Sequence, residues 1–369
     1  MRTIDFFKKD FIFTFSLVLA LIFSVFGKFD LTFIDLKTIF SLFGLMIVVK
    51  AFERLGILAV LAEKMIQLSK TTRHLVGYLI LLSFFSSMFL TNDVAILSLI
   101  PIFITIVRKV KDFPNIAYSV VLFIMAANLG SSLLPFGNPQ NLFLYSYYHL
   151  TIIQFISWML PLALFSLIIL FFLHLKIPKQ TLSIQKKTSH PFFENKKLLL
   201  PGLSFLLMVL AVIGIVPYMY VVPLIFVAFF LGDKKVLAKL DYRLLGTFVF
   251  FFIIVGNLTE WKVLTDTLPA IFLHPLTSLF GAAFVSQIIS NVPAAILIAP
   301  FGSEVQAVLL GVNVGGIGTL IASLANLIGF RLFQLYMPHL KVDFLKKFTW
   351  LNLLVFIVLL MASVVFIYY

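Results

Sequence analysis

The sequence contains no cysteine and few charged residues. The absence of cysteine from 369 residues excludes disulfides, thiolate metal sites and iron–sulfur clusters. Charged residues make up only 12% of the chain and hydrophobic residues 62%. Ordinary soluble domains have about 25% and about 45–50%, respectively. The composition therefore argues against a soluble enzyme.

Several catalytic motifs are also absent. The chain has no phosphate-binding Gly-x-x-x-x-Gly-Lys-Ser/Thr motif, no His-Glu-x-x-His and no Gly-x-Ser-x-Gly. Its six histidines are widely separated and show no metal-binding spacing. We therefore expect no cofactor, and a membrane-embedded enzyme stays only as a remote alternative.

Long apolar segments dominate what is present. They recur from Phe11 onwards, and many approach the ~20 residues that a helix needs to cross a ~30 Å hydrocarbon core. This pattern predicts an all-α polytopic membrane protein. The first series comprises 11–26, 31–50, 55–69, 75–107, 114–148 and 151–175, and the second comprises 198–214, 217–231, 244–259, 274–303, 305–337 and 348–369.

Two segments are too long for one crossing and too short for two. Segment 75–107 has Thr91-Asn92-Asp93 at its midpoint, and segment 274–303 has Ser290-Asn291-Val292-Pro293. Arms of about 16 residues rise about 24 Å, so we predict a re-entrant helical hairpin in each. Segments 114–148 and 305–337 are predicted to be interrupted helices.

The order of segments repeats along the chain. A shift of 199 residues places Asn92 on Asn291, and a shift of 185 places Asn128 on Asn313. Hairpins add no net crossing, so each half is predicted to cross five times. Because five is odd, the second half would have the inverted topology found in secondary transporters. The predicted organisation is a first repeat, 1–175, a cytoplasmic linker, 176–197, and a second repeat, 198–369.

The basic residues fall mostly on one predicted side. Five crossings per half put Lys28, the linker and Lys234 on the side with most Lys and Arg, and Arg54 and Lys262 on the other. The basic side should be the cytoplasm, with both termini outside. The net charge of +13 then reflects topology rather than nucleic-acid binding, and we expect a multi-pass protein of a prokaryotic plasma (inner) membrane.

Polar and small residues gather at the two hairpin tips and the two helix interruptions. Asn ahead of Pro at 138–139 favours a new helix start. Four such starts would offer amide donors and positive partial charge to an anion without Lys or Arg. The candidate substrate- and cation-binding residues are Thr91, Asn92, Asp93, Gly137, Asn138, Pro139, Asn141, Ser290, Asn291, Val292, Gly318, Thr319, Ser323 and Asn326.

Two of these positions allow alternative interpretations. Oxygen ligands at Asn92 and Asn291 could hold Na⁺. Asp93 is an acid in the middle of an apolar segment; it could carry a proton or Na⁺, or it could simply cap the helix that follows. The glycines could also serve only close packing, as in Gly311-x-x-x-Gly315.

These motifs make the chain resemble the ion transporter superfamily, which includes divalent-anion/sodium symporters, citrate permeases, arsenite permeases and some sodium/proton antiporters. The resemblance covers essentially the whole chain. It rests on Thr91-Asn92-Asp93-Val94-Ala95, Ala127-Asn128-Leu129-Gly130, Pro135-Phe136-Gly137-Asn138-Pro139-Gln140-Asn141, Ser290-Asn291-Val292-Pro293 and Gly311-Val312-Asn313-Val314-Gly315-Gly316. It implies an elevator-type carrier, usually a homodimer, in which hairpins and interrupted helices hold substrate and cation.

The chain departs from the superfamily pattern at both tips. Dicarboxylate members have Ser-Asn-Thr there, whereas Asp93 and Val292 occupy the Thr positions in this chain. The departures weaken the expectation of a di- or tricarboxylate, and the Asn-Asp tip is similar to that of arsenite permeases. We expect a secondary active transporter that couples a small anion, carboxylate or inorganic oxyanion, to Na⁺ or H⁺. An arsenite/antimonite exporter or Na⁺/H⁺ antiporter is the alternative.

Overall fold

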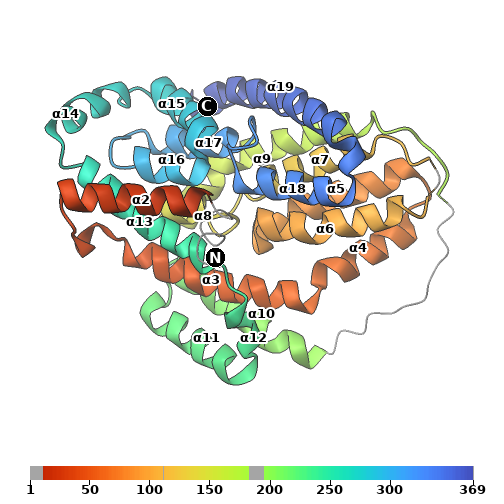
Figure 1. Cartoon of the computed structure of the whole chain (residues 1–369), viewed down its shortest axis with the longest axis horizontal. Helices are drawn as coiled ribbons and strands as arrows, with labels where there is room; N and C mark the ends of the chain where they lie inside the picture. Colours follow the sequence, from red (N-terminus) through yellow and green to blue (C-terminus); the bar gives the residue numbers. More distant parts are fainter. Residues whose placement is uncertain (1–10, 111, 183–194, 369) are drawn as a thin grey trace, which may run out of the picture.

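The computed structural model describes residues 11–110, 112–182 and 195–368, and these residues form helices joined by loops (Figure 1). The first ten residues of the predicted first repeat and most of the predicted linker lie outside the described residues. Within the described residues, α5 (Thr72–Leu90), α9 (Ile152–His174) and the stretch Pro338–Tyr368 are each long and apolar enough to cross a membrane. The bent pair α13 (Tyr242–Leu258) and α14 (Lys262–Ile271) would make a fourth span, and seven shorter apolar helices accompany these. The chain is an all-helical, polytopic membrane protein.

The helices follow one another in two series. The first comprises α2 (Phe11–Phe26), η1 (Leu31–Phe33), α3 (Leu36–Leu55), α4 (Ile57–Leu68), α5 (Thr72–Leu90), α6 (Asn92–Val107), α7 (Ile116–Gly130), α8 (Pro139–Tyr147) and α9 (Ile152–His174). The second comprises α10 (Asn195–Val212), α11 (Tyr218–Gly232), α12 (Lys234–Ala238), α13 (Tyr242–Leu258), α14 (Lys262–Ile271), α15 (Pro275–Ile289), α16 (Asn291–Ile298), α17 (Val305–Gly315), α18 (Leu324–Tyr336), η2 (Pro338–Leu340) and α19 (Lys341–Tyr368).

Two helical hairpins have tips of the same backbone shape. The helix α5 ends and α6 begins around Thr91, which has φ 67° and ψ 153°, and α15 and α16 meet at Ser290, with φ 77° and ψ 152°. Positive φ is unfavourable for residues with a Cβ and is found where the surrounding structure imposes it. Each tip therefore reverses the chain at one strained, non-glycine residue.

Each hairpin packs against an interrupted helix. The arm α5 contacts α7, and α15 contacts α17. A Cβ at Gly130 would overlap the carbonyl oxygen of Phe84, and a Cβ at Gly315 would lie 2.6 Å from the Cβ of Ser286. Glycine is required at both contacts because the backbones approach too closely for a side chain.

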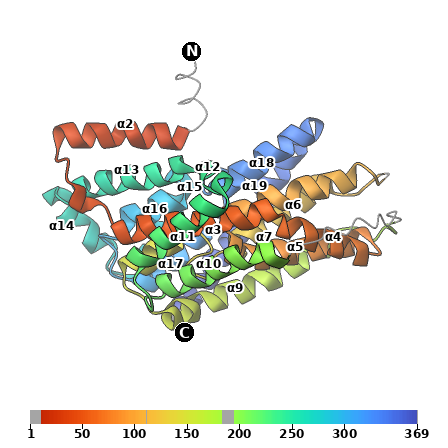
Figure 2. The same ribbon diagram turned by 90° about the horizontal axis from the view of Figure 1, so that it is seen from below.

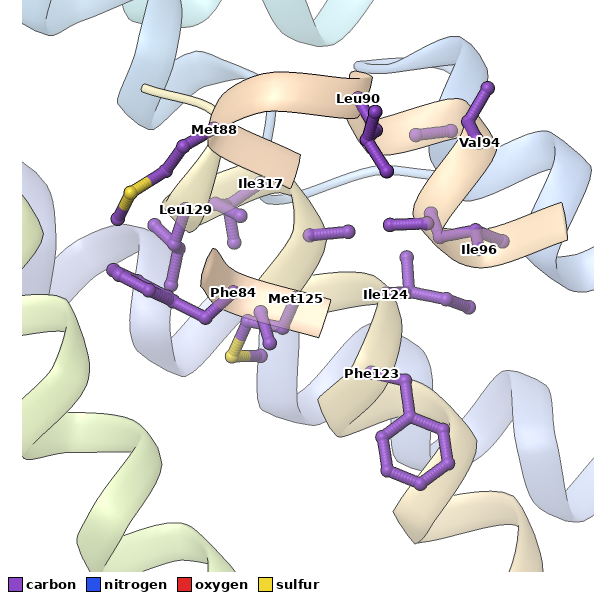
Figure 3. Packing of buried hydrophobic residues seen from close by; sticks show 14 of the residues in the cluster. Phe84, Met88, Leu90, Val94, Ile96, Phe123, Ile124, Met125, Leu129 and Ile317 are labelled. Atoms are coloured by element: carbon purple, nitrogen blue, oxygen red, sulfur yellow. The ribbon is translucent and has the colours of Figure 1, made fainter. Parts of the chain in front are cut away.

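Buried apolar side chains fill the space between the first hairpin and α7. Figure 3 shows Phe84 and Met88 of α5 beside Met125 and Leu129 of α7, with Ile317 from the second series among them. Phe84, Met125 and Ile317 have no exposed surface. This packing holds the hairpin tip against the point where α7 ends.

A second group of helices lies beside the hairpins. Helix α2 runs along α13 at one margin of the molecule (Figures 1 and 2), and α3 contacts α10, α11 and α13. Helix α13 also contacts α16, and α3 contacts α6 and α8. The polar tips therefore face α3 and α13 across the boundary between the two groups.

Two ion pairs contradict the predicted sides of the membrane. Lys28 Nζ lies 2.6 Å from Glu260 Oε2, and Arg54 Nη2 lies 3.3 Å from Asp233 Oδ2. The predicted topology placed an odd number of crossings between the partners of each pair, which would put them on opposite faces. Partners in direct contact must share a face, so the predicted topology has one crossing too many.

The excess crossing is α4. The amide of Thr72 donates to the carbonyl of Gln180 at 2.9 Å, which keeps the start of α5 and the region after α9 on one face. The extra crossing must then be α4, α10 or α11. With 12 residues and Glu63-Lys64 at its centre, α4 is the shortest and rises only about 18 Å. The ion pairs therefore contradict the predicted five crossings of the first half, and a crossing by 55–69 is the one that fits the described residues least.

Candidate functional site

Four helix N-termini meet around one cavity. Helix α6 begins at Asn92, α16 at Asn291, α8 at Pro139 and α18 after its N-cap Ser323, and all four residues line this cavity. We call it the tip cavity. Its other lining residues are Ile12, Asp93, Gln140, Asp241, Leu244, Thr247, Ser290, Val292, Pro293 and Leu324. The cavity is therefore lined by the starts of helices from both halves of the chain.

Local sequence explains why the helices start there. The side chain of Asn138 accepts a hydrogen bond from the amide of Asn141 at 3.0 Å, and Pro139 occupies the first turn of α8. This arrangement is a side-chain N-cap followed by a proline whose missing N–H costs nothing. At the tip of the second hairpin, the amide of Asn291 donates to the carbonyl of Ala322 at 2.9 Å. The second tip is therefore tied to the interruption between α17 and α18.

Buried asparagines connect the first tip to the second half of the chain. Asn92 Nδ2 donates to Asn128 Oδ1 at 2.9 Å, and Ser323 Oγ donates to the same oxygen at 3.0 Å. Asn128 Nδ2 donates in turn to Asn326 Oδ1 at 2.7 Å. All four side chains are at most 6% exposed. Such a network is favourable only because each buried polar group finds a partner.

The matched residues make a second set of bonds with the halves exchanged. Asn313 Nδ2 donates to Asn141 Oδ1 at 2.7 Å, just as Asn128 donates to Asn326. Asn138 Nδ2 donates weakly to Asn313 Oδ1, at 3.4 Å. The residue pairs are those related by the shift of 185, so each half supplies the same donor to the same acceptor of the other half.

A second cavity lies between the first tip and α3 and α13. It is lined by the tip residues Thr91 and Asp93, by Asn138 and Pro139, and by apolar side chains. The charged residues around it are Lys50, Glu53, Lys239 and Asp241. Lys50 Nζ is paired with Glu53 Oε2 at 2.8 Å, and Asp241 caps α13 by accepting from two backbone amides. Among the described residues, none donates a hydrogen bond to the Asp93 carboxylate.

Five of the candidate residues lie away from both cavities. Gly137 packs against the Ser131 backbone. Asn141 and Asn326 are buried in the amide networks. Gly318 has φ 78°, and the amide of Thr319 donates to Gln287 Oε1 at 2.8 Å. These residues hold the interruptions in shape, whereas the remaining candidates line one cavity or both.

Several residues that shape the site are not among the candidates predicted from the sequence. Asn128 and Asn313 are matched positions and belong to the motifs that resemble the superfamily, and that match is the signal for them. Gln287 accepts a hydrogen bond from the amide of Thr319 in the loop before α18. Its sequence signal is that it is a polar residue in an apolar hairpin arm. Asp241 gave no local signal because it lies far along the chain from the tip that it faces. In the described residues, no three His, Asp or Glu side chains form a metal-binding group.

Comparison with known proteins places the chain in a family. The family model described as "Citrate transporter" matches residues 7–310. An uncharacterized transporter of Methanocaldococcus jannaschii is 36% identical over 301 residues, which is 81% of each chain. The inner membrane protein YbiR of Escherichia coli is 32% identical over 301 residues, or 81% of this chain and 80% of that one. The chain, with its helix starts from both halves around one cavity, belongs to the citrate transporter family, within the ion transporter superfamily.

Proposed function

We propose that the protein is a secondary active transporter that couples a small anion, a carboxylate or an inorganic oxyanion, to Na⁺ or H⁺. The observation that carries this proposal is the convergence of four helix N-termini on the tip cavity. The first turn of each helix lines the cavity, and a helix N-terminus carries roughly half a positive charge. No described lining residue is Lys or Arg, so the anion is attracted without a strong fixed ion pair that would retain it.

An elevator movement is consistent with where the cavities lie. The first tip is joined to the interrupted helices by the asparagine networks. The second tip is joined to them by the bond from the Asn291 amide to the Ala322 carbonyl. The tip cavity is completed by Asp241, Leu244 and Thr247 at the start of α13. A unit that slid along α3 and α13 would carry the site with it and change the side from which the cavity opens. The exchanged asparagine bonds support an inverted repeat, which this movement requires.

The ion pairs support a revised placement in the membrane. We place α4 along the cytoplasmic face, so that Arg54, Lys50 and the linker lie in the cytoplasm and Lys28 lies outside. The start of α2 is then cytoplasmic and the end of α19 extracytoplasmic. This assignment concentrates Lys and Arg on the inner face, as the positive-inside rule requires. The names of the relatives support a prokaryotic inner membrane, where we expect a homodimer.

Transport in proteoliposomes tests the function directly. An inward Na⁺ gradient or an inward proton gradient should drive uptake of labelled citrate, malate, phosphate or sulfate, and empty liposomes should take up none. Asn291→Ala should slow the uptake strongly while its elution profile stays that of the folded protein. Gradient-driven uptake of none of these anions would refute the proposal.

A second candidate is a cation/proton antiporter. The observation that favours it is the proximity of Asp93, which has no ion-pair partner among the described residues, to Asp241 around both cavities. Exchange of Na⁺ for protons with no anion present would identify this activity. Transport of arsenite or antimonite in the same assay would instead identify an exporter of those solutes.

A further inference from the structure

The two hairpin tips present different chemistry to the tip cavity. Asp93 and Val292 are the matched third residues of the tips, and both line the cavity. The first tip therefore contributes a carboxylate where the second contributes an apolar side chain. The Asp93 carboxylate accepts no hydrogen bond from any described residue, whereas Asp241 accepts from the amides of Arg243 and Leu244.

The asparagines of the two tips also differ, because the side-chain amide is bonded in the first tip and free to bind a solute in the second. Asn92 Nδ2 is committed to Asn128 Oδ1. The corresponding bond from Asn291 to Asn313 is absent, and within the described residues Asn291 Nδ2 donates no hydrogen bond. Asn291 is only 4% exposed and lines the tip cavity. The Nδ2 atom is not fully enclosed by protein, so a solute or water in the cavity can accept from it.

The cavity thus has an open acceptor at Asp93 and an open donor at Asn291. We propose that it selects a small oxyacid that presents an O–H group to the Asp93 carboxylate and an oxygen to the Asn291 amide. The helix N-termini attract the anionic part of the solute, and the O–H group separates that charge from Asp93. A fully deprotonated anion without a hydroxyl would instead set oxygen against carboxylate oxygen. This inference rests on the proposed function and narrows its substrate class.

Matched pairs of anions test the selectivity. Each pair shares a charge type and differs in an O–H group: malate and succinate, citrate and tricarballylate, hydrogen phosphate and sulfate. Uptake into proteoliposomes and competition against the best labelled probe give the relative affinities. Within at least one pair, the hydroxyl-bearing member should bind at least about tenfold more tightly, because the lost hydrogen bond has a charged acceptor. Equal or reversed affinity in every transported pair would overturn the inference and leave the proposed function intact.

The most informative substitution replaces Asp93 by the residue found at the matched position of the second tip. Asp93→Val gives the first tip the side chain that Val292 gives the second, and it should reduce a pair's discrimination to about twofold or less. Asp93→Asn keeps an acceptor oxygen and should retain the preference for the hydroxyl-bearing member, which covers the case in which the Val variant does not fold. Asn291→Ala should weaken both members of a pair equally. Undiminished discrimination in Asp93→Val would overturn the inference, and transport of none of the six anions would refute the proposed function with it.

Discussion

Removing Asn128 should destabilise the protein more than removal of one surface amide would. Asn128 accepts hydrogen bonds from Asn92 and Ser323 and donates one to Asn326, and all four side chains are buried. Each bond contributes about 0.5–1.5 kcal/mol, and a buried group left without a partner costs about 1–3 kcal/mol. Asn128→Ala should therefore lower the free energy of unfolding by about 3 kcal/mol or more.

Denaturant unfolding in mild detergent, followed by circular dichroism, measures this change. Asn313→Ala, which removes the exchanged bond to Asn141, should cause a loss of similar size. Asn352→Ala is the matched control, because this asparagine is equally buried and its Oδ1 has no partner among the described residues. Its loss should be at least about 1 kcal/mol smaller. Unfolding of Asn128→Ala at the wild-type denaturant concentration would refute the network.

Three further predictions concern backbone and topology. Gly130→Ala should reduce the yield of folded protein because its Cβ would overlap the Phe84 carbonyl, whereas Gly202→Ala, where no atom lies within 4 Å, should express normally; equal yields would contradict the close packing. Thr91→Gly should raise the melting temperature by relieving the positive φ of Thr91, and a lower melting temperature would show that the tip is not strained. In this cysteine-free chain, Lys28→Cys should react with a membrane-impermeant maleimide from outside and Arg54→Cys only from the cytoplasm; the reverse pattern would restore the original topology.

The helix starts were readable from the sequence because their signals are local. Asn138-Pro139 is both a cap and a first-turn proline, and α8 begins there. Thr91 and Ser290 each precede a polar residue in the middle of an apolar run, and the hairpins reverse at these two residues. The structure also shows that Asn92 and Asn291 line one cavity. That meeting depends on long-range packing, which the repeat suggested but could not demonstrate.

The topology could not be derived from hydrophobicity alone. Helix α4 is apolar enough to be counted as a crossing, and it is distinguished by its 12 residues and by Glu63-Lys64 at its centre. Helix α3 also ends later, at Leu55, than the sequence pattern indicated. Asp233 and Glu260 are separated by long stretches of chain from the basic residues that they bind. The proximity of Asp93 and Asp241 around the cavities could not be predicted for the same reason.

Protection of a single cysteine tests most directly whether the tip cavity binds the solute. Val292→Cys lies in this cavity, and Thr319→Cys lies outside it on an exposed loop. We predict that citrate, or whichever anion is transported best, slows labelling of Val292→Cys by a small thiol reagent at least fivefold and leaves Thr319→Cys unaffected. Equal labelling of Val292→Cys with and without a saturating transported anion would contradict the assignment of the site.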